Sequence, residues 1–168
     1  MAVIKNNPTI VDDEKVNINR SAIEHRATWM VLIYEGAAKS GIDAEAFVRS
    51  AVARTGCLHG DIIKSKLQSA FRLDEFADAF LSPVAIKTFE MEFKTRNANS
   101  LEIRFHYCPL VAGWLKAGIP LKDVPKLCDM AMDGDRNIAA TAGLSFSLGR
   151  TIASGDRVCE VNFYRKSP

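Results

Sequence analysis

The chain has 168 residues, of which 48% are hydrophobic and 25% charged, with a formal net charge of +2. This composition excludes a disordered chain, a collagen-like chain and a disulfide-rich miniprotein, and the small net charge argues against a nucleic-acid binder. No apolar run approaches the roughly 20 residues that cross a bilayer, and the N-terminus lacks the apolar segment of a signal peptide. We therefore predict a cytoplasmic protein, one domain over residues 1–168, without membrane or nucleic-acid partners.

The first half of the chain is predicted to be helical. Residues 1–18 show no regular pattern and are expected to form an arm that packs on a neighbour, and residues 19–82 form the helical half. Ser21 and Glu24 make a capping box, after which apolar residues recur at helical spacing until Gly41. Further helices are expected from Asp43 to Gly56, from about Asp61 to Arg72 and from about Asp74 to Leu81.

The second half, residues 83–168, is predicted to contain the sheet. Residues 88–95 and 101–108 alternate between apolar and polar side chains, with turn-forming residues between them, which predicts a hairpin. Two helices should follow, from Pro109 to Lys116 and from about Val124 to Met132, and residues 133–135 end or interrupt the second. Strands at about 144–152 and 157–164 form another hairpin. We therefore predict an α+β fold, in which N-terminal helices precede an antiparallel sheet of about four strands, with helices inserted between two hairpins.

The densest group of reactive side chains lies at the end of the first hairpin. Arg104, His106 and Cys108 are two residues apart, so they should share one face of the strand. A cysteine and a histidine on one face can form a thiolate–imidazolium pair. Because Pro109 favours the first helical position, Cys108 should also cap the next helix, whose N-terminus would lower the pKa of its thiol. The alternative is a small buried cysteine beside a surface histidine.

Charged residues at two other places are further candidates. The first place holds two carboxylates and a guanidinium within four residues: Asp133, Asp135 and Arg136. These residues form either a turn in which Asp135 caps a helical segment, or a functional group that acts as general acid/base or holds a charged substrate. Arg150 closes an apolar strand face, so it either extends to water or binds a substrate carboxylate through two hydrogen bonds.

The remaining cysteines have a simple packing interpretation. The chain has four cysteines, and no two of them form a C-x-x-C pair: Cys57, Cys108, Cys128 and Cys159. Thiols in the cytoplasm are more often free, metal-bound or catalytic than disulfide-linked. Cys128 and Cys159 fall on apolar faces of their predicted elements, where core packing is the simplest role. Strict alternation places Cys159 on a different sheet face from Cys108, unless the chain bends at Cys108-Pro109.

Three cysteines and their flanking residues follow one another in a recognisable order. They are His106-Tyr107-Cys108-Pro109-Leu110, Leu127-Cys128-Asp129 with Asp133-Gly134-Asp135, Arg150-Thr151-Ile152-Ala153-Ser154-Gly155, and Cys159 before Phe163. In this order and spacing, the chain from about residue 100 to its end resembles the L-2-amino-thiazoline-4-carboxylic acid hydrolase family. The family pattern has an acid about three residues after the middle cysteine, where this chain has Ala131.

The resemblance implies a small hydrolase that acts on a carbon–nitrogen bond of a cyclic amidine or amide-like molecule. The named reaction opens L-2-amino-thiazoline-4-carboxylate to N-carbamoyl-L-cysteine. Such a hydrolysis needs a nucleophile, a proton donor to the leaving nitrogen and stabilisation of a tetrahedral centre. We predict that Cys108 attacks and that His106, Asp133 or Asp135 transfers the proton. Arg104 or Arg150 would hold the substrate carboxylate, with Cys128 and Cys159 beside the substrate.

Other roles for the same residues remain open at this point. His106, Cys108, Cys128 and Cys159 would suit zinc or another divalent metal if they converge, and catalysis would then use a metal-activated water. Passive thiols are a third possibility. The alternative function is a non-catalytic sensor that holds a metal or small ligand with its cysteines. We also predict a homo-oligomer.

Overall fold

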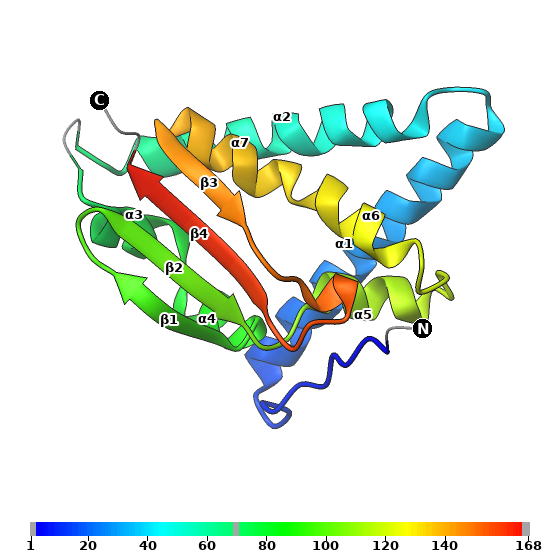
Figure 1. Cartoon of the computed structure of the whole chain (residues 1–168), viewed down its shortest axis with the longest axis horizontal. Helices are drawn as coiled ribbons and strands as arrows, with labels where there is room; N and C mark the ends of the chain where they lie inside the picture. Colours follow the sequence, from blue (N-terminus) through cyan, green and yellow to red (C-terminus); the bar gives the residue numbers. More distant parts are fainter. Residues whose placement is uncertain (1–2, 69–70, 166–168) are drawn as a thin grey trace.

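Two long helices and a four-stranded sheet organise the chain (Figure 1), whose computed structural model describes residues 3–68 and 71–165. Helices α1 (Glu14–Lys39) and α2 (Ala44–Lys64) meet at a turn and diverge, and the sheet lies toward the open end of the V that they form. The other elements are α3 (Leu73–Phe80), α4 (Pro83–Thr88), β1 (Met91–Arg96), β2 (Ser100–Phe105), α5 (Pro109–Lys116), α6 (Val124–Ala131), α7 (Asp133–Thr141), β3 (Leu144–Leu148), a 3-10 turn (Ile152–Ser154) and β4 (Cys159–Arg165).

The sheet is antiparallel throughout, with strand order β1-β2-β4-β3. Each hairpin pairs two strands adjacent in the chain, and α5, α6 and α7 lie between the two hairpins in the sequence. The register pairs Phe105 with Cys159 and Leu101 with Phe163, so these four side chains share the inner face of the sheet. The predicted α+β architecture, with helices inserted between two hairpins, is confirmed.

The first helix begins seven residues before the predicted capping box. Asp13 caps α1 by accepting a hydrogen bond from the N–H of Val16 at 3.2 Å. Val16 and Arg20 are buried on the same helical face as Ile23, and the charged Arg20 hides this continuity in the sequence. The predicted arm of residues 1–18 is therefore wrong in its extent, and the described arm ends at Asp13.

A buried ion pair fastens the arm to its own chain. Arg20 and Glu90 lie 2.9 Å apart, and their side chains are only 6% and 7% exposed. The Glu90 carboxylate also accepts hydrogen bonds from the N–H groups of Thr9 and Ile10, at 2.6 and 2.9 Å. Arg20 donates in turn to the carbonyl of Thr88. The pair thus links the arm, α1 and the segment before β1.

Helix α2 runs without a break through Gly56, where the sequence predicted an end. A Cβ atom at Gly56 would collide with the carbonyl oxygen of Gly134 and lie 2.9 Å from the Cβ of Asn137. Gly56 therefore lets α7 approach α2 closely. The helix predicted over 61–72 is absent as a separate element, since α2 ends at Lys64, and residues 69–70 lie outside the described residues.

Replacing Gly56 with alanine should lower the free energy of unfolding by about 2 kcal/mol, because the added methyl group overpacks the α2–α7 contact. Gly36 in α1 is the matched control, since a Cβ atom there meets nothing within 4 Å. Gly36→Ala should raise stability by about 0.5–1 kcal/mol through helix propensity alone. Urea denaturation of both variants measures the two values. A stabilised Gly56→Ala would contradict the close approach of the helices.

Local turn geometry shortens several predicted strands. Ser82 caps α4 through the N–H of Ala85, with Pro83 at the first helical position, so β1 begins at Met91 and not at residue 88. Glu90, just before β1, has a φ of +50°, which separates the helix from the strand. The strands predicted to 108, to 152 and from 157 are likewise shorter. Within the described ranges, none of the helices is both long and apolar enough to cross a membrane.

Candidate functional site

A cavity of about 460 Å³ lies between the inner face of the sheet and the surrounding helices. Its floor takes side chains from all four strands, and its walls come chiefly from α1, α2, α6 and α7. The floor residues are Met91, Phe105, Cys159, Val161 and Leu148. Most of the lining is apolar, and the volume falls in the range of small-molecule binding sites.

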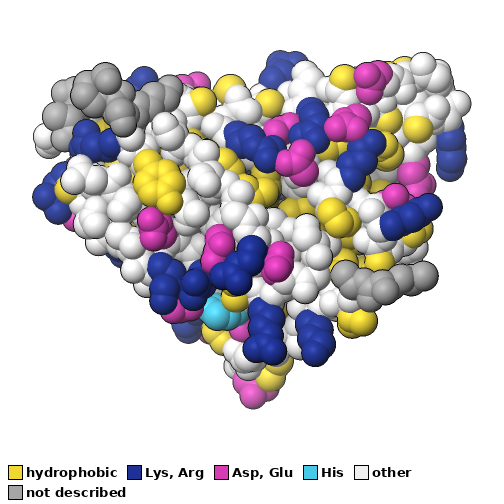
Figure 2. All heavy atoms as spheres, in the orientation of Figure 1, with side chains coloured by type: hydrophobic (Ala, Val, Ile, Leu, Met, Phe, Trp, Pro, Cys, Tyr) yellow, Lys and Arg dark blue, Asp and Glu magenta, His cyan; other side chains and the backbone are white. Residues whose placement is uncertain are grey.

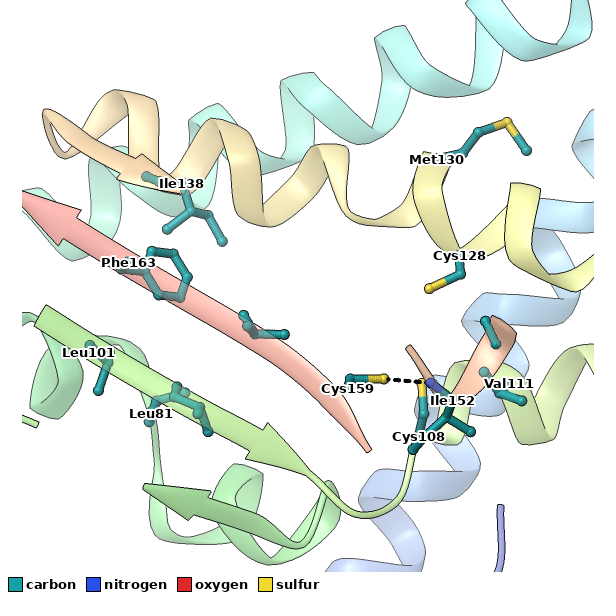
Figure 3. Packing of buried hydrophobic residues seen from close by; sticks show 14 of the residues in the cluster. Leu81, Leu101, Cys108, Val111, Cys128, Met130, Ile138, Ile152, Cys159 and Phe163 are labelled. Atoms are coloured by element: carbon teal, nitrogen blue, oxygen red, sulfur yellow. Dashed lines mark hydrogen bonds between the residues drawn. The ribbon is translucent and has the colours of Figure 1, made fainter. Parts of the chain in front are cut away.

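Three cysteines from different elements point toward one another in this cavity (Figure 3). Cys108 precedes α5, Cys128 lies on α6 and Cys159 begins β4, and all three are buried free thiols. Burial raises the pKa of Cys128 to about 12, and the nearby Cys108 contributes to that shift. Burial and Cys108 likewise raise the pKa of Cys159, whose sulfur accepts a hydrogen bond from the Ile152 N–H at 3.3 Å. At neutral pH these two thiols are protonated.

A bend after β2 directs Cys108 into the cavity. The N–H groups of His106 and Tyr107 donate to the carbonyls of Glu90 and Phe89, and the regular strand has already ended at Phe105. Strand alternation therefore does not extend to Cys108, which turns to the same side as Cys159. The predicted helix-capping position of Cys108, with Pro109 as the first helical residue, is confirmed.

The N-terminal arm holds the backbone of Cys108. The side-chain amide of Asn6 donates to the Cys108 carbonyl, and the Cys108 N–H donates to the Asn6 oxygen, each at 2.8 Å. Both backbone polar groups of the residue are thus bound by one side chain.

The pKa of the Cys108 thiol is higher than that of an ordinary cysteine, contrary to the prediction. Burial is the main cause, while the N–H groups of Val111 and Leu110 and the charge of Arg26 act in the opposite direction. The helix N-terminus thus has the predicted influence, but burial outweighs it. A reaction at Cys108 consequently needs a base that removes the thiol proton.

Asp135 is a suitable base in the same cavity. It lies in the first turn of α7, and burial raises its pKa to about 6, against the opposing influence of Arg26, its own backbone N–H and Arg136. A carboxyl that titrates near neutral pH can both accept and donate a proton during catalysis.

Arg26 of α1 is the cationic side chain of the cavity, and sequence reasoning missed it. Its guanidinium lowers the pKa values of Asp135 and Cys108, yet within the described part of the chain it forms no ion pair. The available signal was its place beside Ala27 and four residues before Met30, at the edge of the apolar helical face. His59 of α2, in a segment that suggested no site, also lines the cavity.

Replacing Asp135 with asparagine should stabilise the protein at alkaline pH. Because the folded pKa is raised, the stabilising effect of the protonated carboxyl is complete below about pH 4 and disappears as pH rises through about 6. The variant should therefore match the parent protein at pH 4 and exceed its free energy of unfolding by about 2 kcal/mol at pH 8. Urea denaturation at pH 4, 6 and 8 measures the difference. An equal pH dependence for both proteins would contradict the raised pKa.

His106, Arg104 and Arg150 do not reach the cavity, so the predicted grouping of these residues with Cys108 is wrong. The ring of His106 pairs with Glu92 at 3.0 Å, while Arg104 and Arg150 lie 3.5 and 2.7 Å from Glu160. The paired strand positions place these charges on the outer sheet face, opposite Phe105 and Cys159. Figure 2 shows acidic and basic side chains interleaved over that end of the sheet.

Asp133 has a different role from Asp135. Its carboxylate lies 3.0 Å from Arg49 of α2 and 2.6 Å from Arg136, and it does not line the cavity. Asp129 joins the same two guanidinium groups at 2.6 and 2.5 Å. This network connects α2 to α6 and α7, which makes Asp133 a structural residue and leaves Asp135 as the carboxyl group of the site.

The predicted metal-binding set does not assemble. His106 lies on the opposite face of the sheet from the three inward cysteines. Across residues 3–68 and 71–165, no three His, Cys, Asp or Glu side chains are grouped to bind one metal ion.

Comparison with known proteins identifies the family of the chain. Residues 20–163 match the family model described as L-2-amino-thiazoline-4-carboxylic acid hydrolase. The searches of curated proteins and of solved structures gave no match. The matched span includes Arg26, Cys108, Cys128, Asp135 and Cys159, and it covers most of the chain. The chain therefore belongs to the L-2-amino-thiazoline-4-carboxylic acid hydrolase family.

Proposed function

We propose that this protein hydrolyses a carbon–nitrogen bond of a small cyclic amidine or amide-like substrate, with Cys108 as the nucleophile. The observation that carries the proposal is the meeting of three complementary groups in one cavity: the Cys108 thiol, the Asp135 carboxyl and the Arg26 guanidinium. The description of the family supports a hydrolase.

The first step is attack on the amidine carbon. Asp135, ionised at neutral pH because its pKa is about 6, accepts the proton of the Cys108 thiol. The sulfur then forms a bond to the amidine carbon, and the electrons of the carbon–nitrogen double bond move to nitrogen. The N–H groups of Leu110 and Val111 at the start of α5 favour the thiolate from which this attack begins.

The second step releases the product. With L-2-amino-thiazoline-4-carboxylate, the bond from the amidine carbon to the ring sulfur breaks and Asp135 returns the proton to that sulfur; with an amide-like substrate, the carbon–nitrogen bond breaks and the departing nitrogen takes the proton. Water then attacks the carbon that is bound to Cys108, and the Cys108 sulfur leaves as the restored thiol. The rate should therefore fall as pH drops through about 6, because protonated Asp135 cannot act as the base.

Arg26 is proposed to hold the substrate carboxylate, the role first assigned to Arg104 or Arg150. Its guanidinium has no ion-pair partner within the described residues and lies close enough to Cys108 to influence the thiol pKa. A pair of charge-assisted hydrogen bonds from Arg26 would bind the substrate carboxylate, and this would place the adjoining ring beside the Cys108 sulfur.

An activity assay with L-2-amino-thiazoline-4-carboxylate tests the proposal. Ring opening should give a product heavier by one water, detected by mass spectrometry. Arg26→Gln should raise KM at least about tenfold and change kcat much less, because the lost contact binds substrate and transition state alike. Arg104→Gln and Arg150→Gln are matched controls on the outer sheet face and should leave KM unchanged. A KM that depends on Arg104 or Arg150 and not on Arg26 would contradict this assignment.

A further inference from the structure

The cavity is larger than a small polar amidine requires. L-2-Amino-thiazoline-4-carboxylate has about nine non-hydrogen atoms, which at roughly 20 Å³ each in a close-packed site occupy roughly 180 Å³. The cavity measures about 460 Å³. More than half of the space would remain unfilled around such a substrate, and close-packed contact on every side would be lost.

The reactive groups are gathered at one end of this space. Figure 3 shows Cys108, Cys128 and Cys159 together, with Ile138 and Leu81 well separated from them along the sheet. On β4, Val161 lines the cavity two positions after Cys159, about 7 Å further along an extended strand. The cavity thus continues beyond the cysteines over Val161, toward Ile138 and Leu81.

The other end is apolar. Phe80 packs against Phe163 with ring centroids 5.5 Å apart, which places it at the far level of the strand. Phe80, Leu81, Ile138, Val161 and Leu148 all line the cavity. His59, which is exposed on α2, lines this cavity and also borders a neighbouring hollow with Phe80 and Ile138.

We propose that the substrate of this protein carries, besides the carboxylate and the amidine or amide carbon, an apolar substituent of about six to eight carbons that lies over Val161 toward Ile138 and Phe80. This inference rests on the proposed function, because that function places the carboxylate at Arg26 and the reacting carbon at Cys108. The same hydrolysis then acts on an amphipathic molecule, and the apolar end of the cavity selects it.

A chain-length series tests the inference directly. The assay compares 2-amino-thiazoline-4-carboxylate with analogues bearing hexyl or benzyl groups on the exocyclic nitrogen. Each buried methylene contributes about threefold to fourfold in binding, so kcat/KM should rise at least about tenfold from the parent compound to the hexyl analogue. A kcat/KM that is equal or lower for both analogues would overturn the inference.

Two variants of β3 locate the substituent. Leu148→Trp adds bulk inside the apolar end, whereas Ser147→Trp adds the same bulk on the outer face of the same edge strand. Aromatic side chains suit strands, so both variants should fold, which thermal unfolding verifies. Leu148→Trp should reduce kcat/KM at least tenfold more for the hexyl analogue than for the parent compound, while Ser147→Trp changes neither value. Equal effects of Leu148→Trp on both substrates would count against the proposed location.

A binding probe separates this inference from the proposed chemistry. Octanoate has the carboxylate and the chain but no hydrolysable bond, and acetate lacks the chain. Octanoate should raise the melting temperature at millimolar concentration, with a weaker effect in Arg26→Gln, whereas acetate should not. If octanoate binds but no amidine is hydrolysed, the proposed function fails and the apolar site stands. If amidines are hydrolysed through Cys108 without any effect of chain length or octanoate, the inference fails and the proposed function stands.

Discussion

Replacing Cys108 with serine is expected to lower kcat by at least about a thousandfold. The hydroxyl is far less acidic than the thiol, so Asp135, with a pKa of about 6, cannot remove its proton to a useful extent. The substitution keeps the size and the capping position of the side chain, and KM should therefore change little. Steady-state kinetics at pH 7.5, beside thermal unfolding of both proteins, measures the effect.

The other cysteines provide the controls. Cys57 is exposed and does not line the cavity, so Cys57→Ser should retain full activity. Cys128→Ser should lower kcat/KM by less than about tenfold, because the Cys128 thiol is protonated at neutral pH and contributes only packing to the site. A Cys108→Ser protein with nearly normal turnover would eliminate the covalent mechanism and leave Asp135 to activate water.

Replacing Arg20 with methionine should lower the free energy of unfolding by about 3–5 kcal/mol. Glu90 would remain buried without its cation, while the arm residues Thr9 and Ile10 still donate to it. Burial pushes the pKa of Glu90 upward, but these N–H groups, the Thr9 hydroxyl and Arg20 outweigh it, and the net pKa is below the usual range. The stabilisation is therefore present at neutral pH and is lost as pH falls through that lowered pKa.

Urea denaturation at pH 7 and pH 4 measures the effect of Arg20→Met. The difference from the parent protein should shrink at the lower pH, since protonation of Glu90 removes the uncompensated charge. The double variant with Glu90→Gln should recover part of the lost stability at pH 7, because its buried pair is neutral. A single variant within 1 kcal/mol of the parent protein would show that the pair does not hold the arm.

Local patterns predicted the elements whose signals lie within a few neighbouring residues. The helix from Pro109 to Lys116 and the order of the two hairpins follow from proline, glycine and strict alternation, and they are confirmed. The continuity of α2 was not predictable in this way, because Gly56 is explained by Gly134, a residue of another helix. The start of α1 was not predictable for a related reason, since Glu90, the buried partner of Arg20, lies 70 positions away.

In the candidate site, too, some features follow from neighbouring residues in the sequence and others depend on residues far away in the chain. Cys108 and Asp135 could be singled out by residue type, but the bend after Phe105 decides that Cys108 faces the cavity while His106 faces outward. The local sign of Arg26 is only its place at the edge of the apolar helical face, because an arginine beside His25 on a helix is typical of a solvated surface. Only the packing of α1 against α5, the helix that Cys108 precedes, brings it near the thiol. The homo-oligomer stays a prediction.

The two hydrogen bonds between Asn6 and Cys108 join positions 102 residues apart, and Asn6 precedes the span that matches the family. A recombinant fragment trimmed to residues 20–163 would retain every side chain proposed to act in catalysis. It would nevertheless lose the two hydrogen bonds between Asn6 and the backbone of Cys108, and the three hydrogen bonds that Thr9 and Ile10 donate to the Glu90 carboxylate. Low activity in such a fragment would reflect where it was cut, so kinetic work on this protein should keep residues 3–13.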